Sequence, residues 1–183
     1  DALVSLAFPA PCRICEATLT NASRIPICAG CLALLAPLRA PGCESCGRPF
    51  PAGADFLPRQ PLCHLCRRGV YAFDVARSYG AYHDAMVRAL LLLKYEGIRP
   101  LGNWLGERLA ELAASDPALS PADVVVPVPL HPSRLRERGH NQAELLARPL
   151  ARRLGLPLRS YLLVRTRPRP DKLKLTRRER WTT

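Results

Sequence analysis

Pro11-Cys12-Arg13-Ile14-Cys15 begins a series of four Cys-x-x-Cys pairs that occupies the first 66 residues of this 183-residue chain. Two thiolates separated by two residues can hold one metal ion from a tight turn, and two such pairs complete a tetrahedral zinc site. The gaps between successive pairs are 12, 11 and 16 residues, which is typical of two consecutive ribbon-type sites. The sequence therefore predicts two zinc ions, whose ligands are Cys12, Cys15, Cys28, Cys31, Cys43, Cys46, Cys63 and Cys66.

The way in which these cysteines pair has alternatives. An even number of cysteines also permits disulfides. However, a disulfide within Cys-x-x-Cys is typical of redox sites, and four of them in series would be unusual as structural cross-links. We favour a sequential grouping, in which the first two pairs hold one ion and the last two hold the other. The alternative is a cross-brace that groups the first pair with the third. His64 lies inside the last pair and is interpreted as a spectator, because four thiolates already fill the site.

Composition divides the chain into a double zinc-ribbon domain, predicted at residues 1–70, and a second domain at 71–183. Residues 1–66 have many prolines and few long apolar runs, so zinc must supply their folding free energy, about 10 kcal/mol per site. The remainder has apolar stretches adequate for a core. No apolar run approaches the roughly 18 residues that span a bilayer, so we expect no membrane insertion. Reduced thiols, and no secretory signal before the first pair, favour the cytoplasm.

Periodicity in the second domain predicts an α/β fold. Helices are expected at 84–95, ended by Gly97, at 101–114, and at 141–154, where Asn141 is the cap and Pro149 should introduce a kink. Strands are expected at 71–82, 123–130 and 156–165. The valine-rich segment at 123–130 reads as a buried strand, which is typical of a parallel sheet covered by helices on both faces.

Positive charge is concentrated in the last third of the chain. The formal net charge is +12, and residues 131–183 contain 15 basic and 4 acidic side chains. Several of these basic groups lie in the loop at 127–141, after the predicted valine strand, and ligands of open α/β sheets bind where strands end. Phosphate is the expected counterpart. The predicted phosphate-binding residues are Arg134, Arg136, Arg138, Asn141 and Gln142.

Simpler interpretations of this loop stay open. The arginines can be solvated surface groups, Asn141 only a helix cap, and Gln142 a surface residue. Lys94, at the end of its predicted helix, is more often just a cation that suits a helix C-terminus. His131 and His140 have no carboxylate partner that the sequence assigns, so neither is predicted to be catalytic.

Four blocks of sequence together point to one family. They are the cysteine pairs, Leu93-Lys-Tyr-Glu-Gly97, Val125-Val-Pro-Val-Pro-Leu-His131 and Arg134-Leu-Arg-Glu-Arg-Gly-His-Asn-Gln-Ala143. With these blocks the chain resembles the ComF family of competence proteins over nearly its whole length. The resemblance implies a double zinc ribbon joined to a type I phosphoribosyltransferase-like, parallel-sheet domain. It also implies a role in DNA uptake and natural transformation, with single-stranded DNA or a phosphorylated small molecule, and proteins of the uptake machinery, as partners.

Departures from the family pattern lead to further expectations. His140 stands where the family usually has an aromatic residue, and Pro149 interrupts a helix that usually has none. The family's motif for phosphoribosyl pyrophosphate, Asp-Asp-x-x-Thr-Thr-Gly, is absent, and no two acidic residues are adjacent. We therefore expect this chain to stop before that motif and to lack ordinary transferase activity. The alternatives are a phosphoribosyltransferase when full length, or a zinc-ribbon interaction module on an inactive domain.

Overall fold

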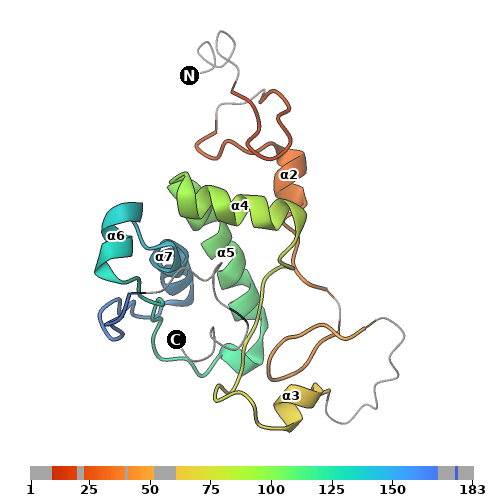
Figure 1. The fold of residues 1–183 in the computed structure, drawn as a ribbon. Coiled ribbons are helices and arrows are strands. Elements are labelled where there is room, and N and C mark those ends of the chain that lie inside the picture. Colours follow the sequence, from red (N-terminus) through yellow and green to blue (C-terminus); the bar gives the residue numbers. More distant parts are fainter. Residues whose placement is uncertain (1–9, 20–22, 40, 52–60, 169–175, 177–183) are drawn as a thin grey trace. The chain divides into compact units, whose positions relative to one another are not determined.

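The computed structural model describes residues 10–19, 23–39, 41–51, 61–168 and 176 (Figure 1). The helices of these residues are α2 (Ala29–Ala33), α3 (His64–Arg67), α4 (Asp84–Tyr95), α5 (Arg99–Ser115), the 3-10 helix η1 (Pro117–Leu119), α6 (Pro132–Arg138) and α7 (Gln142–Leu154). The chain forms two compact units. The first comprises residues 1–90 and 111–121, and the second comprises 91–110 and 122–183. The domain boundary after residue 70 stays a prediction.

The predicted parallel sheet is not supported, because extended segments of the described residues form only isolated bridges. Pro11 pairs with Thr18 and Gly42 with Pro49, both antiparallel, at the two cysteine turns. The third bridge joins Val125 to one residue of the segment predicted as a strand at 156–165, in the parallel sense. The α/β assignment therefore fails for the described part of the chain, and the remaining architecture is helical.

The valine segment at 123–130 is extended, but it pairs on one side only. Its Val125 N–H donates to the Pro157 carbonyl at 2.9 Å, and its carbonyl accepts from the Arg159 N–H at 3.0 Å. Pro127 and Pro129 have no N–H to donate, so they cannot continue a ladder. The prediction of a buried strand was wrong, since Val124 is 36% exposed and Val128 is 65% exposed.

The segment at 71–82, predicted as one or two strands, forms no strand. Its backbone instead bonds to loops of the first unit. The Ala76 N–H donates to the Ser45 carbonyl at 2.7 Å, and the Leu38 N–H donates to the Tyr79 carbonyl at 2.7 Å. An extended backbone must satisfy its polar groups somewhere, and here cysteine-ribbon loops supply the partners that a neighbouring strand would supply in a sheet.

The predictions for the three long helices are close to the structure. α4, α5 and α7 begin and end within two residues of the predicted ranges. The Asn141 side chain caps α7 by accepting from the Ala143 N–H at 3.0 Å, and Gly155 ends it with a left-handed φ of 67°. Pro149 lies inside α7 and is fully buried, so it contributes to the core as well as to the helix.

Helix α6 lies inside the segment that was predicted to be a loop at 127–141. Pro132 occupies its first turn, where the missing N–H costs nothing. The His131 side chain caps it, with Nδ1 accepting from the Ser133 N–H at 3.3 Å. Gly139 ends it with a φ of 72°, which suits glycine. Start and stop signals thus lie on either side of this helix. Its seven residues are too few to show a clear helical periodicity in the sequence.

Helices α5 and α7 lie side by side in the second unit (Figure 1), and two glycines of α5 form the contact. A Cβ added to Gly102 would lie 2.8 Å from the Leu145 Cβ, and one added to Gly106 would lie 2.5 Å from the Leu146 carbonyl oxygen. The missing side chains therefore let the two helices approach closely. The buried apolar side chains of this unit include Leu92, Leu93, Leu101, Leu105, Ala110, Ala147, Pro149 and Ala151.

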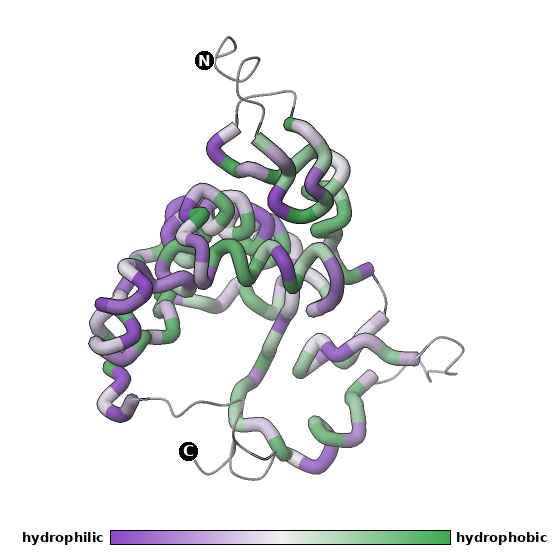
Figure 2. The backbone as a smooth tube through the Cα atoms, turned by 45° about the horizontal axis from the view of Figure 1, so that its top comes forward, coloured by the Kyte–Doolittle hydropathy of each residue, from purple (hydrophilic) through white to green (hydrophobic). Residues whose placement is uncertain are grey.

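Hydrophobic and hydrophilic residues alternate at short intervals along the described backbone (Figure 2). Such mixing is what helices need when one face packs on a core and the other meets water. Within the part of the chain that the structure describes, no helix combines the length and the apolar character needed to cross a bilayer.

Candidate metal centres and anion site

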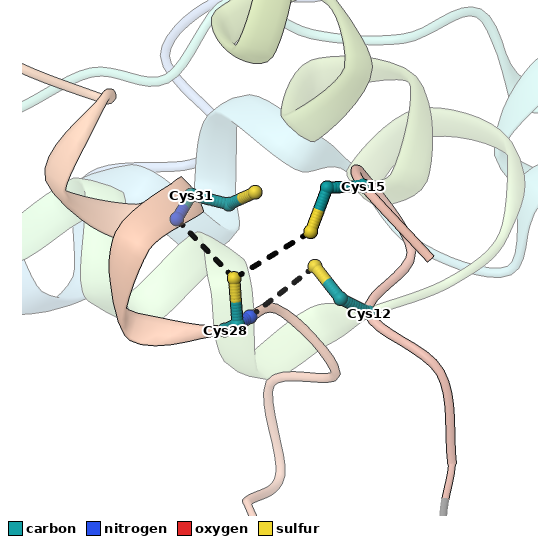
Figure 3. A group of neighbouring side chains, drawn as sticks. All are labelled: Cys12, Cys15, Cys28 and Cys31. Atoms are coloured by element: carbon teal, nitrogen blue, oxygen red, sulfur yellow. Dashed lines mark hydrogen bonds between the residues drawn. The ribbon is translucent and has the colours of Figure 1, made fainter. Parts of the chain in front are cut away.

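Four sulfur atoms converge in the first ribbon, two from a turn and two from the start of α2 (Figure 3). All four Sγ atoms lie within 4.8 Å of one another, and the Cys15 and Cys28 sulfurs are 3.7 Å apart. Zinc–sulfur bonds of about 2.3 Å in a tetrahedron place the sulfurs about 3.8 Å apart. This cluster therefore has the dimensions of a four-thiolate zinc site, and its members are Cys12, Cys15, Cys28 and Cys31.

The second ribbon repeats this arrangement with two cysteines from a turn and two from the start of α3. The four Sγ atoms again lie within 4.8 Å of one another, and those of Cys46 and Cys63 are 3.7 Å apart. All eight cysteines are free thiols in this structure. The grouping is sequential, as preferred, and not a cross-brace. The second cluster consists of Cys43, Cys46, Cys63 and Cys66.

Backbone N–H groups favour the thiolate form of Cys12 in the first cluster and of Cys43 and Cys63 in the second by lowering their pKa. The Cys28 N–H donates to the Cys12 sulfur, and the Cys63 N–H donates to the Cys43 sulfur, both at 3.3 Å. Burial alone would raise the pKa of Cys12 and Cys43, but the backbone hydrogen bonds outweigh it and lower each pKa to about 6. Burial raises the pKa of the Cys66 thiol to about 12. Zinc must therefore displace the remaining protons when it binds.

The residue after each N-terminal cysteine pair adopts a left-handed backbone, and the two ribbons differ there. Glu16 has a φ of 65° and Gly47 a φ of 67°. This conformation costs about 1–2 kcal/mol for a residue with a Cβ. We therefore predict that Glu16→Gly raises the free energy of unfolding of the zinc-loaded first ribbon by about 1 kcal/mol. Denaturant unfolding of the zinc-loaded protein, followed by zinc release to a chromogenic chelator, measures the change.

The reciprocal substitution in the second ribbon serves as the comparison. Gly47→Ala should lower the free energy of unfolding by about 2–3 kcal/mol, because its Cβ would also lie 2.8 Å from the Ala76 carbonyl oxygen. If both substitutions changed stability in the same direction, the backbone explanation would be refuted.

The predicted phosphate-binding arginines lie on α6. Arg134 Nη1 donates to both carboxylate oxygens of Glu137, at 3.0 and 2.8 Å, so its charge is partly balanced. Arg136 is exposed to solvent. Arg138 is half-buried, and it is held by uncharged groups: its guanidinium carbon lies 5.3 Å from the centre of the Tyr95 ring.

The two predicted amide residues position the backbone and an arginine. Asn141 uses its oxygen for the α7 cap and donates from Nδ2 to the Val128 carbonyl at 3.1 Å. Gln142 Oε1 accepts from Arg138 Nη1 at 2.5 Å. The structure thus joins Arg138 and Gln142 directly, whereas both polar atoms of the Asn141 side chain form hydrogen bonds within the chain.

A pocket of about 150 Å³ lies between the end of α4 and α6 in the second unit. Its lining residues are Lys94, Tyr95, Gly97, Arg134, Glu137 and Arg138. From the sequence alone, Lys94 is interpreted only as a helix cation, and Tyr95 has no predicted role. These residues belong to the Leu93-Lys-Tyr-Glu-Gly97 block, which the sequence singles out. The block is far from α6 in the sequence, so their contact could not be predicted.

Comparison with known protein families supports the metal centres. Residues 3–67 match the family described as the double zinc ribbon domain. Comparisons with curated proteins and with solved structures give no match. The matched range contains all eight cysteines, so both clusters fall within it. The N-terminal part of this chain is therefore a double zinc ribbon whose two four-cysteine clusters fit two zinc ions.

Proposed function

We propose that this protein binds a phosphate-bearing ligand, single-stranded DNA in the first instance, through the arginines of α6. In this proposal it is a cytoplasmic competence protein of the ComF kind that assists DNA uptake and natural transformation. The zinc ribbons would then be the module that contacts proteins of the uptake machinery. The sequence resemblance and the location of the positive charge support this role, and the geometry of Arg138 supports the ligand class.

Arg138 carries the proposal because its guanidinium is held in place without being neutralised. Its partners are the amide oxygen of Gln142 and the ring of Tyr95, and both are uncharged. Among the residues that the structure describes, no carboxylate forms an ion pair with Arg138. An arginine fixed by neutral partners keeps its charge for an external anion and loses little freedom on binding.

The surrounding sequence is suited to a polyanion. Residues 131–183 hold 15 of the 27 basic side chains and only 4 of the 15 acidic ones. Phosphate contacts of this type give binding with little sequence preference. Three of these basic residues, Arg177, Arg178 and Arg180, lie outside the described residues.

Replacing Arg134, Arg136 and Arg138 together by glutamine tests the proposal. The affinity for a labelled oligo(dT) strand should fall, because three phosphate contacts are lost. The slope of log affinity against log salt should become shallower by about 2, since each contact on a single strand contributes about 0.7. Fluorescence anisotropy across a salt series measures both quantities.

A second triple variant provides a matched control with the same change in charge. Arg148, Arg152 and Arg153 lie on α7, where Arg148 pairs with Glu144 and Arg152 with Glu107. Replacing these three by glutamine should change the salt slope much less. An equal loss of affinity in both variants would indicate a basic surface that binds any polyanion. An unchanged salt slope in the α6 variant would show that α6 does not contact the nucleic acid.

A zinc-ribbon interaction module is the second candidate function, and the family match over residues 3–67 favours it. It predicts that the wild-type chain shows no salt-dependent binding of single-stranded DNA. We do not extend the proposal to a phosphoribosyltransferase reaction, because the sequence lacks an adjacent acidic pair and the described residues form no sheet.

A further inference from the structure

The pocket between the end of α4 and α6 has a net positive lining. Lys94, Arg134 and Arg138 contribute three positive charges and Glu137 one negative charge. Within the described part of the chain, Lys94 forms no ion pair, so its ammonium is available to a ligand. With a volume of about 150 Å³, the pocket has room for a phosphate group. It is smaller than the roughly 300–1,000 Å³ of sites that enclose a whole small molecule.

Hydrogen bonds connect the two walls of this pocket. His140 is 8% exposed, and its Nε2 and Nδ1 atoms lie 2.8 Å from the Leu93 carbonyl and 3.1 Å from the Arg138 carbonyl. Leu93 lies in α4 directly before Lys94, and Arg138 is the last residue of α6. Arg99 Nη2 also donates to the Gly139 carbonyl at 3.1 Å. The spacing between Lys94 and Arg138 is therefore set by the fold and not by two flexible side chains alone.

Tyr95 places an aromatic ring at the mouth of the pocket. The guanidinium of Arg138 covers one face of this ring, yet the residue is 70% exposed. Most of Tyr95 is therefore accessible to solvent. Bases of single strands stack on exposed aromatic rings in just this way, and the stacking tolerates any base because each has a π-face. The cation–π contact between Arg138 and the ring would add to the stabilisation of the stacked base.

We propose that this pocket binds one phosphate of a nucleotide between Lys94 and Arg138, while the attached base stacks on Tyr95. The inference rests on the proposed function, because it specifies where the phosphate-bearing ligand meets the chain. The nucleotide can be free in solution or part of a DNA strand, and the chemistry of the site is the same for both.

Tyr95→Ala tests the stacking contact on the full zinc-loaded chain. The probes are a labelled 12-mer of oligo(dT) and an abasic strand of the same length and charge. We expect Tyr95→Ala to weaken oligo(dT) binding about tenfold, since stacking is worth about 1–3 kcal/mol per base, and to weaken abasic binding much less, because Gln142 still holds Arg138. Tyr95→Phe should bind both strands as the wild type does. Retention of two zinc ions and an unchanged melting temperature show that each variant is folded.

The phosphate contact needs a separate variant. Lys94→Gln should weaken both strands several-fold, and more than Arg153→Gln, which removes one exposed charge from α7. Competition by thymidine 5′-monophosphate, but not by thymidine, would identify a free nucleotide as ligand. If the monophosphate does not compete while Tyr95 still distinguishes the two strands, the ligand is a nucleotide within a strand.

Two results would overturn the inference while leaving the proposed function intact. In the first, Tyr95→Ala binds oligo(dT) as tightly as the wild type does. In the second, Tyr95→Ala weakens the abasic strand as much as oligo(dT), which would assign Tyr95 a structural role. If the wild-type chain bound neither strand at low salt, the proposed function itself would fail, and this outcome is distinct from the other two.

Discussion

Cys28→Ser is expected to remove one of the two zinc ions and to unfold the first ribbon, while the second ribbon keeps its metal. Cys28 has three roles. It supplies a sulfur to the cluster, its sulfur accepts from the Cys31 N–H at 3.4 Å to cap α2, and its own N–H donates to the Cys12 sulfur. A structural zinc contributes about 10–16 kcal/mol of folding free energy, so the loss cannot be offset by the small core of the ribbon.

Metal analysis by mass spectrometry measures the outcome directly. The wild-type chain should hold two zinc ions, Cys28→Ser one, and the double variant with Cys63→Ser none. His64→Ala is the control, because His64 lies between Cys63 and Cys66 in the sequence but is not a member of the second cluster. Two ions retained by Cys28→Ser, or fewer than two in the wild type, would contradict the two-site assignment. The helical signal of α5 and α7 should persist, since their buried contacts contain no cysteine.

Gly106→Ala is expected to lower the free energy of unfolding of the second unit by about 2 kcal/mol or more. Its Cβ would lie 2.3 Å from Pro149 Cγ and 2.5 Å from the Leu146 carbonyl oxygen. A proline ring and a helical backbone have little freedom to retreat, and overpacking typically costs about 1–3 kcal/mol, occasionally more. The higher helix propensity of alanine returns about 1 kcal/mol, which does not compensate for a clash this close.

Urea unfolding followed by the helical signal measures this effect, and two further variants locate its cause. Gly102→Ala should cost less, because its nearest contacts are the side chains of Leu145 and Leu93, which can shift. Pro149→Ala in the Gly106→Ala background should recover part of the stability, since it removes one of the two clashing groups, and the two effects should then be non-additive. Stabilisation by Gly106→Ala would show that α5 and α7 do not pack through this contact.

Local features of the molecule could be predicted from the sequence, because residues a few positions apart decide them. Two cysteines separated by two residues form a metal-binding turn whatever the rest of the chain does. The cap at Asn141 and the left-handed end at Gly155 likewise depend on one turn of helix. Gly102 and Gly106 could have been recognised as a helix contact, since two glycines one turn apart in a helical pattern usually have a packing reason.

The sequence by itself therefore determined the double zinc ribbon and the three long helices of this protein. Only the tertiary structure decided that the valine segment would bridge Leu158 once and stay partly exposed, because a strand forms only where neighbouring backbones pair with it. The tertiary structure also brought Lys94 and Tyr95 to one pocket with Arg138. Lys94 and Tyr95 lie far from Arg138 in the chain, and no local period relates them to it. Their proximity to Arg138 therefore follows from how α4, α6 and α7 pack.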